Sequence, residues 1–401
     1  MNEIKIKGID EYVCYFLLLL FPIISQYNIK GLVSVFTVGY VILLFFIMYI
    51  INHYSCINIH KSILVFACFI MIHDVLNNLN IVKYAGTWLK YLTIFLFMFV
   101  SLGRINEERF YKVWKIVGII WISAIMFQSV QVYVLGNDVG IIKIPFLYSD
   151  AKNFDRMYNR PHGLFMEPAA YVTNMLPLLF LNFKHKDYIY AIINTFSILL
   201  TTSTTGIVLS AMLWGLYIFT SNTLKPNAKV ALISAFIFIS ILFLNMSVFS
   251  EGLNKLATED VNNNARTNGG YIIFRELSLK NKILGIQFID VKEFLLVTNF
   301  DLSLLNMTKE TTFLGYTNAI SYVMICYGII GLLFYIYMFA MIYKDGKKEY
   351  LPLLVICVVS QFGQSVFINN FFVVQFIVLY CMNKFDNNVI RIKLRRGTGE
   401  N

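Results

Sequence analysis

Long apolar runs, separated by short polar stretches, follow one another along almost the whole chain. A helix needs about 20 mostly apolar residues to cross a bilayer, and windows of this kind recur from one end of the sequence to the other. The pattern predicts an all-α protein, a polytopic membrane helix bundle of about twelve transmembrane helices. The predicted spans cover residues 12–28, 32–52, 62–79, 84–103, 113–135, 167–183, 188–203, 205–220, 229–250, 315–343, 350–366 and 368–382.

The composition supports a membrane protein. Hydrophobic residues make up 58% of the chain and charged residues only 14%, which is far from the balance of a soluble domain. No polar stretch is long enough for a separate soluble domain, so we expect residues 1–401 to form a single integral membrane domain. The six cysteines have neither metal-ligand nor disulfide-framework spacing, and we expect no metal site and no cofactor.

The basic residues predict the orientation in the membrane. An even number of spans places both termini on one side. With the N-terminus inside, more than half of the 33 lysines and arginines fall in inner connections and in the tail at 383–401, as the positive-inside rule requires. The short outer connections then hold only Lys30, Lys83 and Lys90. We therefore expect cytoplasmic termini, and a net charge of +10 that reflects membrane anchoring with no need for nucleic acid.

Two long outer loops remain, at about 136–166 and 251–314. Loops of this length in compact proteins are usually functional or disordered, and both loops are too rich in apolar residues to be disordered. We expect short helices that lie along the outer surface. The second loop has an amphipathic pattern before Gly285, with apolar residues at Ile272, Ile273, Leu277 and Leu279.

The stretch NRPHGLFMEPAAY, residues 159–171, has the densest polar chemistry of the chain. Pro168 suits the first turn of a helix, so Glu167 is expected at the outer end of the sixth span. Helical spacing then puts Tyr171 and Asn174 on the same face as Glu167. Glu167 is a candidate general base and Arg160 a candidate phosphate contact. The simpler alternative is that Glu167 complements the helix dipole and that Arg160 anchors lipid headgroups.

Four arginines are expected to face outward, namely Arg156, Arg160, Arg266 and Arg275. The forked guanidinium binds phosphate better than lysine does, which favours an anionic outer substrate. His162 is either a turn residue or a proton carrier. The residues expected to be catalytic are Glu167, Arg160 and Arg275. Those expected to bind substrate are Arg156, His162, Tyr171, Asn174, Arg266 and Asn318.

The sequence has no Walker A phosphate loop, no metal-ligand cluster and no nucleophile elbow. An enzyme built on these residues is therefore expected to need neither ATP nor a metal.

The pattern R-x-x-G-x-F-x-E-P, formed by Arg160, Gly163, Phe165, Glu167 and Pro168, resembles a segment of Wzy-type O-antigen and capsule repeat-unit polymerases. Three further stretches are similar to that family: residues 199–210, the part of the second outer loop from Arg266 to Gly285, and residues 317–333. Two positions depart from the pattern. Thr204 stands where many relatives have arginine, and Thr317 stands where the related O-antigen ligases have histidine.

The resemblance implies a fold like that of the C-type membrane glycosyltransferases, in the inner membrane of a bacterial cell. It implies transfer of a growing glycan from one undecaprenyl diphosphate carrier to a repeat unit on another, at the outer face of the membrane. The implied partners are the undecaprenyl-diphosphate-linked glycan, membrane lipids and a chain-length regulator protein. The implied reaction needs no cofactor and involves no nucleic acid.

Two alternatives stay open. One is an O-antigen ligase, against which the missing histidine at 317 counts. The other is a flippase or transporter of the lipid-linked oligosaccharide. Transporters usually carry ionisable residues at mid-membrane and repeated halves, whereas the clear intramembrane acid here is Asp74, near an outer helix end and close enough to pair with Lys83 or Lys90. This distribution favours surface chemistry.

Overall fold

The computed structural model describes residues 2–27, 37–77, 81–148, 157–220, 225–244, 268–286, 290–301, 317–365, 367–383, 385 and 387–393. Regular structure in these residues is almost entirely helical. The first nine helices are α1 (Asn2–Ile24), α2 (Val38–His53), α3 (Lys61–Asn77), α4 (Ile81–Ser101), α5 (Glu107–Tyr133), α6 (Pro168–Lys184), α7 (Tyr188–Leu200), α8 (Thr204–Thr220) and α9 (Pro226–Leu244). They are followed by α11 (Gly270–Glu276), α12 (Leu279–Leu284), α13 (Val291–Val297), α14 (Ala319–Asp345), η4 (Lys348–Tyr350), α15 (Leu351–Gly363), α16 (Asn370–Phe376) and η5 (Ile377–Cys381).

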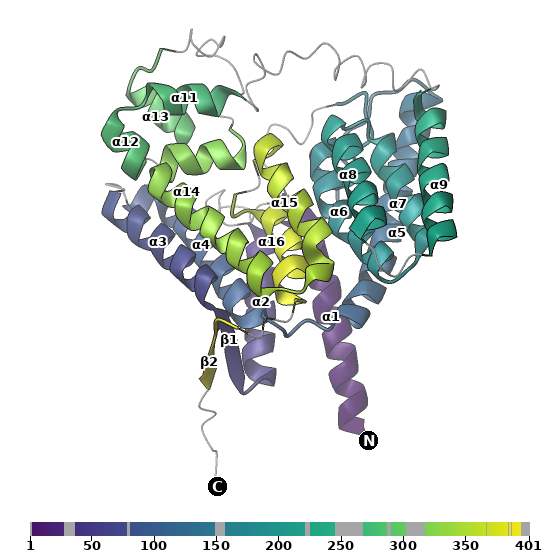
Figure 1. Cartoon of the computed structure of the whole chain (residues 1–401), viewed down its shortest axis with the longest axis horizontal. Coiled ribbons are helices and arrows are strands. Elements are labelled where there is room, and N and C mark those ends of the chain that lie inside the picture. Colours follow the sequence, from purple (N-terminus) through teal and green to yellow (C-terminus); the bar gives the residue numbers. More distant parts are fainter. Residues whose placement is uncertain are drawn as a thin grey trace.

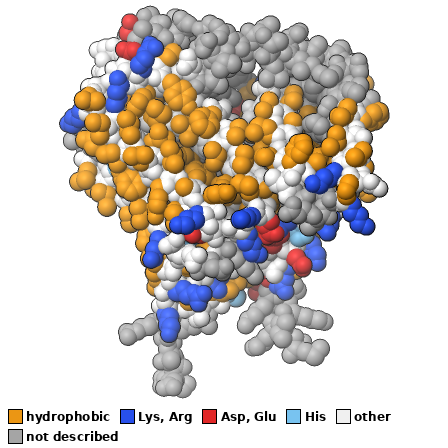
Figure 2. All heavy atoms as spheres, in the orientation of Figure 1, with side chains coloured by type: hydrophobic (Ala, Val, Ile, Leu, Met, Phe, Trp, Pro, Cys, Tyr) orange, Lys and Arg blue, Asp and Glu red, His pale blue; other side chains and the backbone are white. Residues whose placement is uncertain are grey.

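A helix occupies each of the twelve stretches that the apolar pattern predicts as spans. By length and composition, three helices in the described residues are long and apolar enough to cross a membrane: α4 from Tyr84, α5 and α14. Four shorter apolar helices accompany them, namely α2, α7, α8 and the segment Asn370–Cys381. A broad band of hydrophobic side chains covers the middle of the visible face, and most of the charged side chains lie below it (Figure 2). The chain is thus a helical protein in which three of the described helices are long and apolar enough to cross a membrane.

The helices form two groups joined by α15 and α16 (Figure 1). One group holds α5 to α9, and the other holds α3, α4 and α11 to α14. We call the end of the molecule with α11 the upper end, and the end with the two strands the lower end. The start of α1 and both strands lie at the lower end (Figure 1).

The segment between α15 and α16, residues 364–369, connects both groups and is called the hairpin tip here. The side-chain oxygen of Gln364 accepts a 2.7 Å hydrogen bond from Thr173 of α6, and its backbone oxygen accepts one of 2.9 Å from Ala319 of α14. The Phe367 ring lies 6.3 Å from Tyr91 of α4 and 6.3 Å from Phe66 of α3. The hairpin tip therefore determines how α6 and α14 sit against each other.

The α14 helix, expected as one continuous span, is broken at Gly328. This glycine has φ +67, and a Cβ there would lie 2.2 Å from the backbone oxygen of Ile283. Gly285, directly after α12, has φ +85, and a Cβ there would lie 2.1 Å from the backbone oxygen of Cys326. The two backbones touch because both positions are glycine, and the nitrogen of Ile286 donates a 2.9 Å hydrogen bond to the oxygen of Ile325.

The second predicted loop forms short helices, as expected, but not one amphipathic helix. Two helices, α11 and α12, replace it, with a break at Leu277 and Ser278. Ile273 and Leu277 are buried, whereas Leu279 is 74% exposed. A Cβ at Gly270 would lie 2.1 Å from the hydroxyl oxygen of Ser321, so α11 packs directly on the start of α14.

One small sheet accompanies the helices of the predicted all-α fold. Strands β1 (Cys56–His60) and β2 (Val389–Lys393) pair in antiparallel fashion, with Asn58 opposite Arg391. The tail predicted at 383–401 thus contributes a strand at 389–393. A hydropathy pattern does not reveal this pairing because the two short segments are more than 300 residues apart.

Lys83 and Lys90, expected in a short outer connection, both lie within α4, since this helix already begins at Ile81. Lys30 lies outside the described residues.

Candidate functional site

The segment before α6, residues 157–167, is held by two glutamine side chains. The Gln128 oxygen, near the end of α5, accepts hydrogen bonds of 2.8 and 2.7 Å from the backbone nitrogens of His162 and Gly163. The Gln26 oxygen, just after α1, accepts one of 2.7 Å from the nitrogen of Met166. We call these two residues the glutamine clamp. It fixes the backbone immediately before Glu167 without using the side chains of the R-x-x-G-x-F-x-E-P pattern.

His162 is buried within this segment. Its Nδ1 atom lies 3.1 Å from the backbone oxygen of Arg160, and its Nε2 atom has no hydrogen-bond partner among the described residues. Burial lowers the pKa of the imidazole, and the nearby Arg160 charge adds to this effect, against the opposing influence of the Arg160 carbonyl. The ring is therefore neutral at pH 7, and its Nε2 atom is buried in this conformation.

Arg160 and Glu167 are both half-buried. Glu167 is the N-cap residue of α6, with extended backbone and Pro168 after it, as the sequence predicts. Its carboxylate does not accept a capping hydrogen bond from the first turn of α6. The carboxylate therefore does not serve as a conventional helix cap.

Tyr171 and Asn174 are fully buried, so neither offers surface to a sugar in this conformation. The Tyr171 hydroxyl lies 2.7 Å from the Ser197 hydroxyl of α7. The Asn174 amide nitrogen donates to the backbone oxygen of Ala170, and its side-chain oxygen has no partner among the described residues. The expected polar face of α6 exists, but here it packs against α7. These residues position α6.

Arg275 and Asn318 belong to the other helix group. The Arg275 side chain is 72% exposed on α11, and its ion-pair partner is the adjacent Glu276. Asn318 is buried and caps α14, accepting a 2.8 Å hydrogen bond from the nitrogen of Ser321. Asn318 is linked to α6 through the neighbouring Ala319, which donates to Gln364 of the hairpin tip. Two further candidates, Arg156 and Arg266, lie outside the described residues.

The amide side chains of Gln361, Gln364 and Asn370 form hydrogen bonds between helices. Tyr335 donates a 2.8 Å hydrogen bond to Gln361, and Asn370 donates one of 2.8 Å to Ser25 after α1. The glutamine clamp was missed. The available signal was the position of Gln26 and Gln128 near the ends of apolar runs, where an amide side chain usually satisfies backbone groups of a loop.

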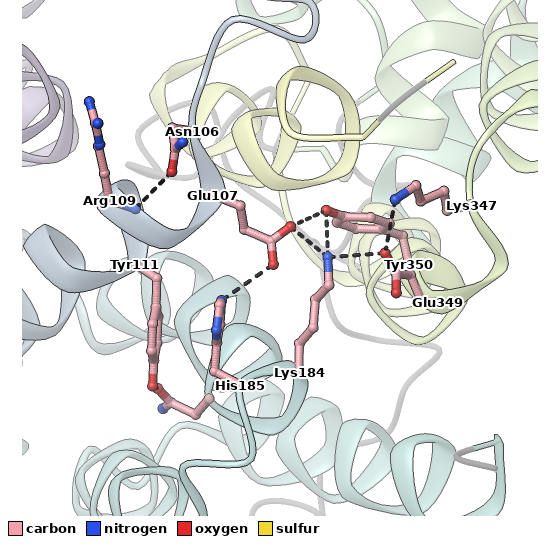
Figure 3. A network of polar contacts seen from close by, with 10 residues as sticks. Asn106, Glu107, Arg109, Tyr111, Lys184, His185, Lys347, Glu349 and Tyr350 are labelled. Carbon is pink, nitrogen blue, oxygen red and sulfur yellow. Dashed lines mark hydrogen bonds and ion pairs between the residues drawn. The ribbon is translucent and has the colours of Figure 1, made fainter. Parts of the chain in front are cut away.

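A second polar cluster lies at the lower end and was also missed (Figure 3). One carboxylate oxygen of Glu107 accepts a 2.6 Å hydrogen bond from Tyr350 and contacts Lys184. The other oxygen lies 3.3 Å from the Nε2 atom of His185. This Glu107 cluster joins the first turn of α5 to the last turn of α6 and to η4. Opposite charges at these helix ends were the available signal.

A cavity of about 610 Å³ adjoins the Glu107 cluster. Its charged lining residues are Glu11, Arg104, Glu107, Glu108, Arg109 and Lys347. Acids and bases balance, and Arg109 is paired with Glu11. The cavity therefore does not favour a ligand of either charge.

The part of the chain described here contains no group of three or more histidine, cysteine or acidic side chains arranged to hold a metal ion. No protein-family model, no curated protein and no solved structure matches this chain.

Proposed function

We propose that this chain is a membrane glycosyltransferase that polymerises undecaprenyl-diphosphate-linked oligosaccharide repeat units into O-antigen, capsular polysaccharide or exopolysaccharide. The observation that carries the proposal is the glutamine clamp on the R-x-x-G-x-F-x-E-P segment. It presents Arg160 and Glu167, both half-buried, at the start of α6. In the proposed orientation the upper end faces the outside of the bacterial inner membrane, and both termini are cytoplasmic.

In the proposed reaction, a hydroxyl of the acceptor sugar attacks the anomeric carbon of the donor glycan. A new glycosidic C–O bond forms while the bond from the anomeric carbon to the carrier diphosphate breaks. Glu167 takes the proton of the attacking hydroxyl, and Arg160 stabilises the charge that develops on the departing diphosphate. Because the donor is already activated, this chemistry requires no ATP.

The remaining candidates have supporting roles in the proposal. His162 binds a sugar hydroxyl through its Nε2 atom once movement of the segment before α6 exposes this buried atom, while Tyr171 and Asn174 hold the start of α6 in position. Arg275 is a second cation for the donor diphosphate, brought close by movement of the α11 region or by the substrate itself.

The test is a glycan ladder, resolved by gel electrophoresis, from a host in which the gene is deleted. Complementation uses the wild type, Arg160→Ala, Glu167→Gln and Arg275→Ala, with membrane abundance measured for each. The matched control is Lys292→Ala, which removes an exposed cation from α13. We expect deletion to collapse the ladder to a single repeat, and Arg160→Ala and Glu167→Gln to fail at normal abundance. Full ladders from both variants would contradict the catalytic assignment.

The same gel separates the alternatives. Loss of a ligase would remove every repeat from lipid A core while long lipid-linked glycan accumulates. Loss of a flippase would leave single lipid-linked repeats on the inner face of the membrane. Either result would replace the polymerase proposal.

A further inference from the structure

Lys90 lies close to the middle of α4, one of the three helices long and apolar enough to cross a membrane. At about 1.5 Å per residue, it is about 13 Å from the start of the helix and about 16 Å from its end. Ionisable side chains at such depth are rare and usually functional.

The side chain of Lys90 is on the inner side of α4. The lipid-facing side carries Leu89, Leu92 and Leu96, which are 38–43% exposed and recur at helical spacing. Ile94 and Phe97, four and seven residues after Lys90, share its face and are fully buried. Lys90 is half-buried on that face, so it points into the bundle and still keeps accessible surface.

Lys90 has no ion pair and no hydrogen bond to any residue that the structure describes, and its Nζ atom lies 5.0 Å from the centroid of the adjacent Tyr91 ring. Of the two pairings with Asp74 that the sequence suggests, the one with Lys90 does not form. Asp74 instead accepts a 3.4 Å hydrogen bond from Tyr327 and lies 3.7 Å from the Nδ1 atom of His73. An unpaired charge inside a helix bundle costs stability, so its presence calls for a ligand.

Lys90 is next to the element that holds α6. The following residue, Tyr91, packs against Phe367 of the hairpin tip, and Gln364 of the same tip binds Thr173. Thr173 is six residues after Glu167, about 9 Å further along α6. The hairpin tip thus connects the part of α4 that carries Lys90 with the part of α6 that follows Glu167.

We propose that Lys90 binds the diphosphate group of the lipid carrier inside the helix bundle. The inference rests on the proposed function and adds a residue that the family resemblance does not supply. An ammonium group binds phosphate oxygens as a compact point charge, and a lipid diphosphate brings the counter-charge that Lys90 lacks. The carrier's prenyl chain would remain among apolar helix surfaces.

The experiment measures binding of farnesyl diphosphate to the full chain in lipid nanodiscs, with farnesyl monophosphate and inorganic pyrophosphate for comparison. The variants are Lys90→Met and Lys90→Arg. Lys112→Met is the matched control, because it removes an exposed lysine near the lower end of α5. We expect Lys90→Met to weaken farnesyl diphosphate binding at least about tenfold, Lys90→Arg to retain most of it, and Lys112→Met to equal the wild type.

Thermal unfolding without ligand gives a second readout. Removing a half-buried charge that has no partner among the described residues relieves its cost, so Lys90→Met should unfold at the same temperature as the wild type or a higher one. Equal diphosphate binding by Lys90→Met and wild type would overturn the inference, and so would a wild type that binds inorganic pyrophosphate but no farnesyl diphosphate. The proposed function is tested separately by the glycan ladder, because that experiment compares cells with and without the gene and does not measure binding of farnesyl diphosphate.

Discussion

The side-chain oxygen of Gln128 accepts a 2.8 Å hydrogen bond from the backbone nitrogen of His162. The same oxygen accepts from Gly163, and the amide nitrogen donates to the backbone oxygen of Gly140. One glutamine on α5 therefore holds both ends of the first predicted loop together. The loop is built around an amide side chain because its buried N–H groups need an acceptor.

Gln128→Leu should lower both stability and activity. It leaves two buried backbone donors unsatisfied, and each unsatisfied group costs about 1–3 kcal/mol. We expect a lower apparent unfolding temperature in detergent and a shortened glycan ladder. The control is Gln131→Leu, which removes a 3.1 Å hydrogen bond from Asn137 at an exposed site. If the two variants behave alike, the clamp has no special role.

The glycine contact between α12 and α14 should tolerate no side chain. We expect Gly285→Ala and Gly328→Ala to destabilise the protein strongly, since each adds a backbone clash to the cost of positive φ, itself about 1–3 kcal/mol. Gly136→Ala is the matched control, with φ +70 and nothing within 4 Å of the added Cβ. Fluorescence-detected size exclusion after heating measures the difference. Equal losses of stability in all three variants would show that the positive φ accounts for the effect and that the backbone contact does not.

Glu107 and Lys184 should be energetically coupled. Their side chains are only 22% and 18% exposed, whereas Arg275 and Glu276 are 72% and 41% exposed. A double-mutant cycle with Glu107→Gln and Lys184→Met should give a coupling energy of about 0.5–3 kcal/mol. The cycle with Arg275→Ala and Glu276→Ala should give less than about 1 kcal/mol. A larger value for the exposed pair would contradict the structural role of the Glu107 cluster.

Acidification should destabilise the fold through buried histidine. Burial lowers the pKa of His162 below its ordinary value of 6.5. Between the two pKa values the unfolded chain binds the proton more readily, so stability decreases as the pH falls below about 6.5. Burial also lowers the pKa of His60. The test therefore compares variants.

The wild type and His162→Asn should be unfolded thermally at pH 7.5 and 5.5, with the exposed His53→Asn as control. We expect the wild type and His53→Asn to lose more stability on acidification than His162→Asn does. An equal loss in all three proteins would mean that His162 does not titrate in this range.

The positions of the helices could be predicted because each depends on a local property. A run of apolar residues marks a helix whatever surrounds it, and Pro168 marks the start of α6 through its own missing N–H. The same local logic placed Glu167 at the end of a helix. The break of α14 at Gly328 was not predicted. It depends on contact with Ile283 and Gly285, which a hydropathy pattern does not reveal.

The sequence by itself determined that the chain is helical and rich in apolar runs long enough to cross a membrane, where its helices lie, and which segment has the densest polar chemistry. Only the tertiary structure decided how polar groups are placed: the clamp of Gln26 and Gln128, the pairing of β1 with β2, the burial of Tyr171, and the lack of a counter-charge for Lys90 among the described residues. The reason is physical. Hydropathy and helical spacing act over a few neighbouring residues, whereas a hydrogen bond or an ion pair depends on groups that the fold brings together from distant parts of the chain.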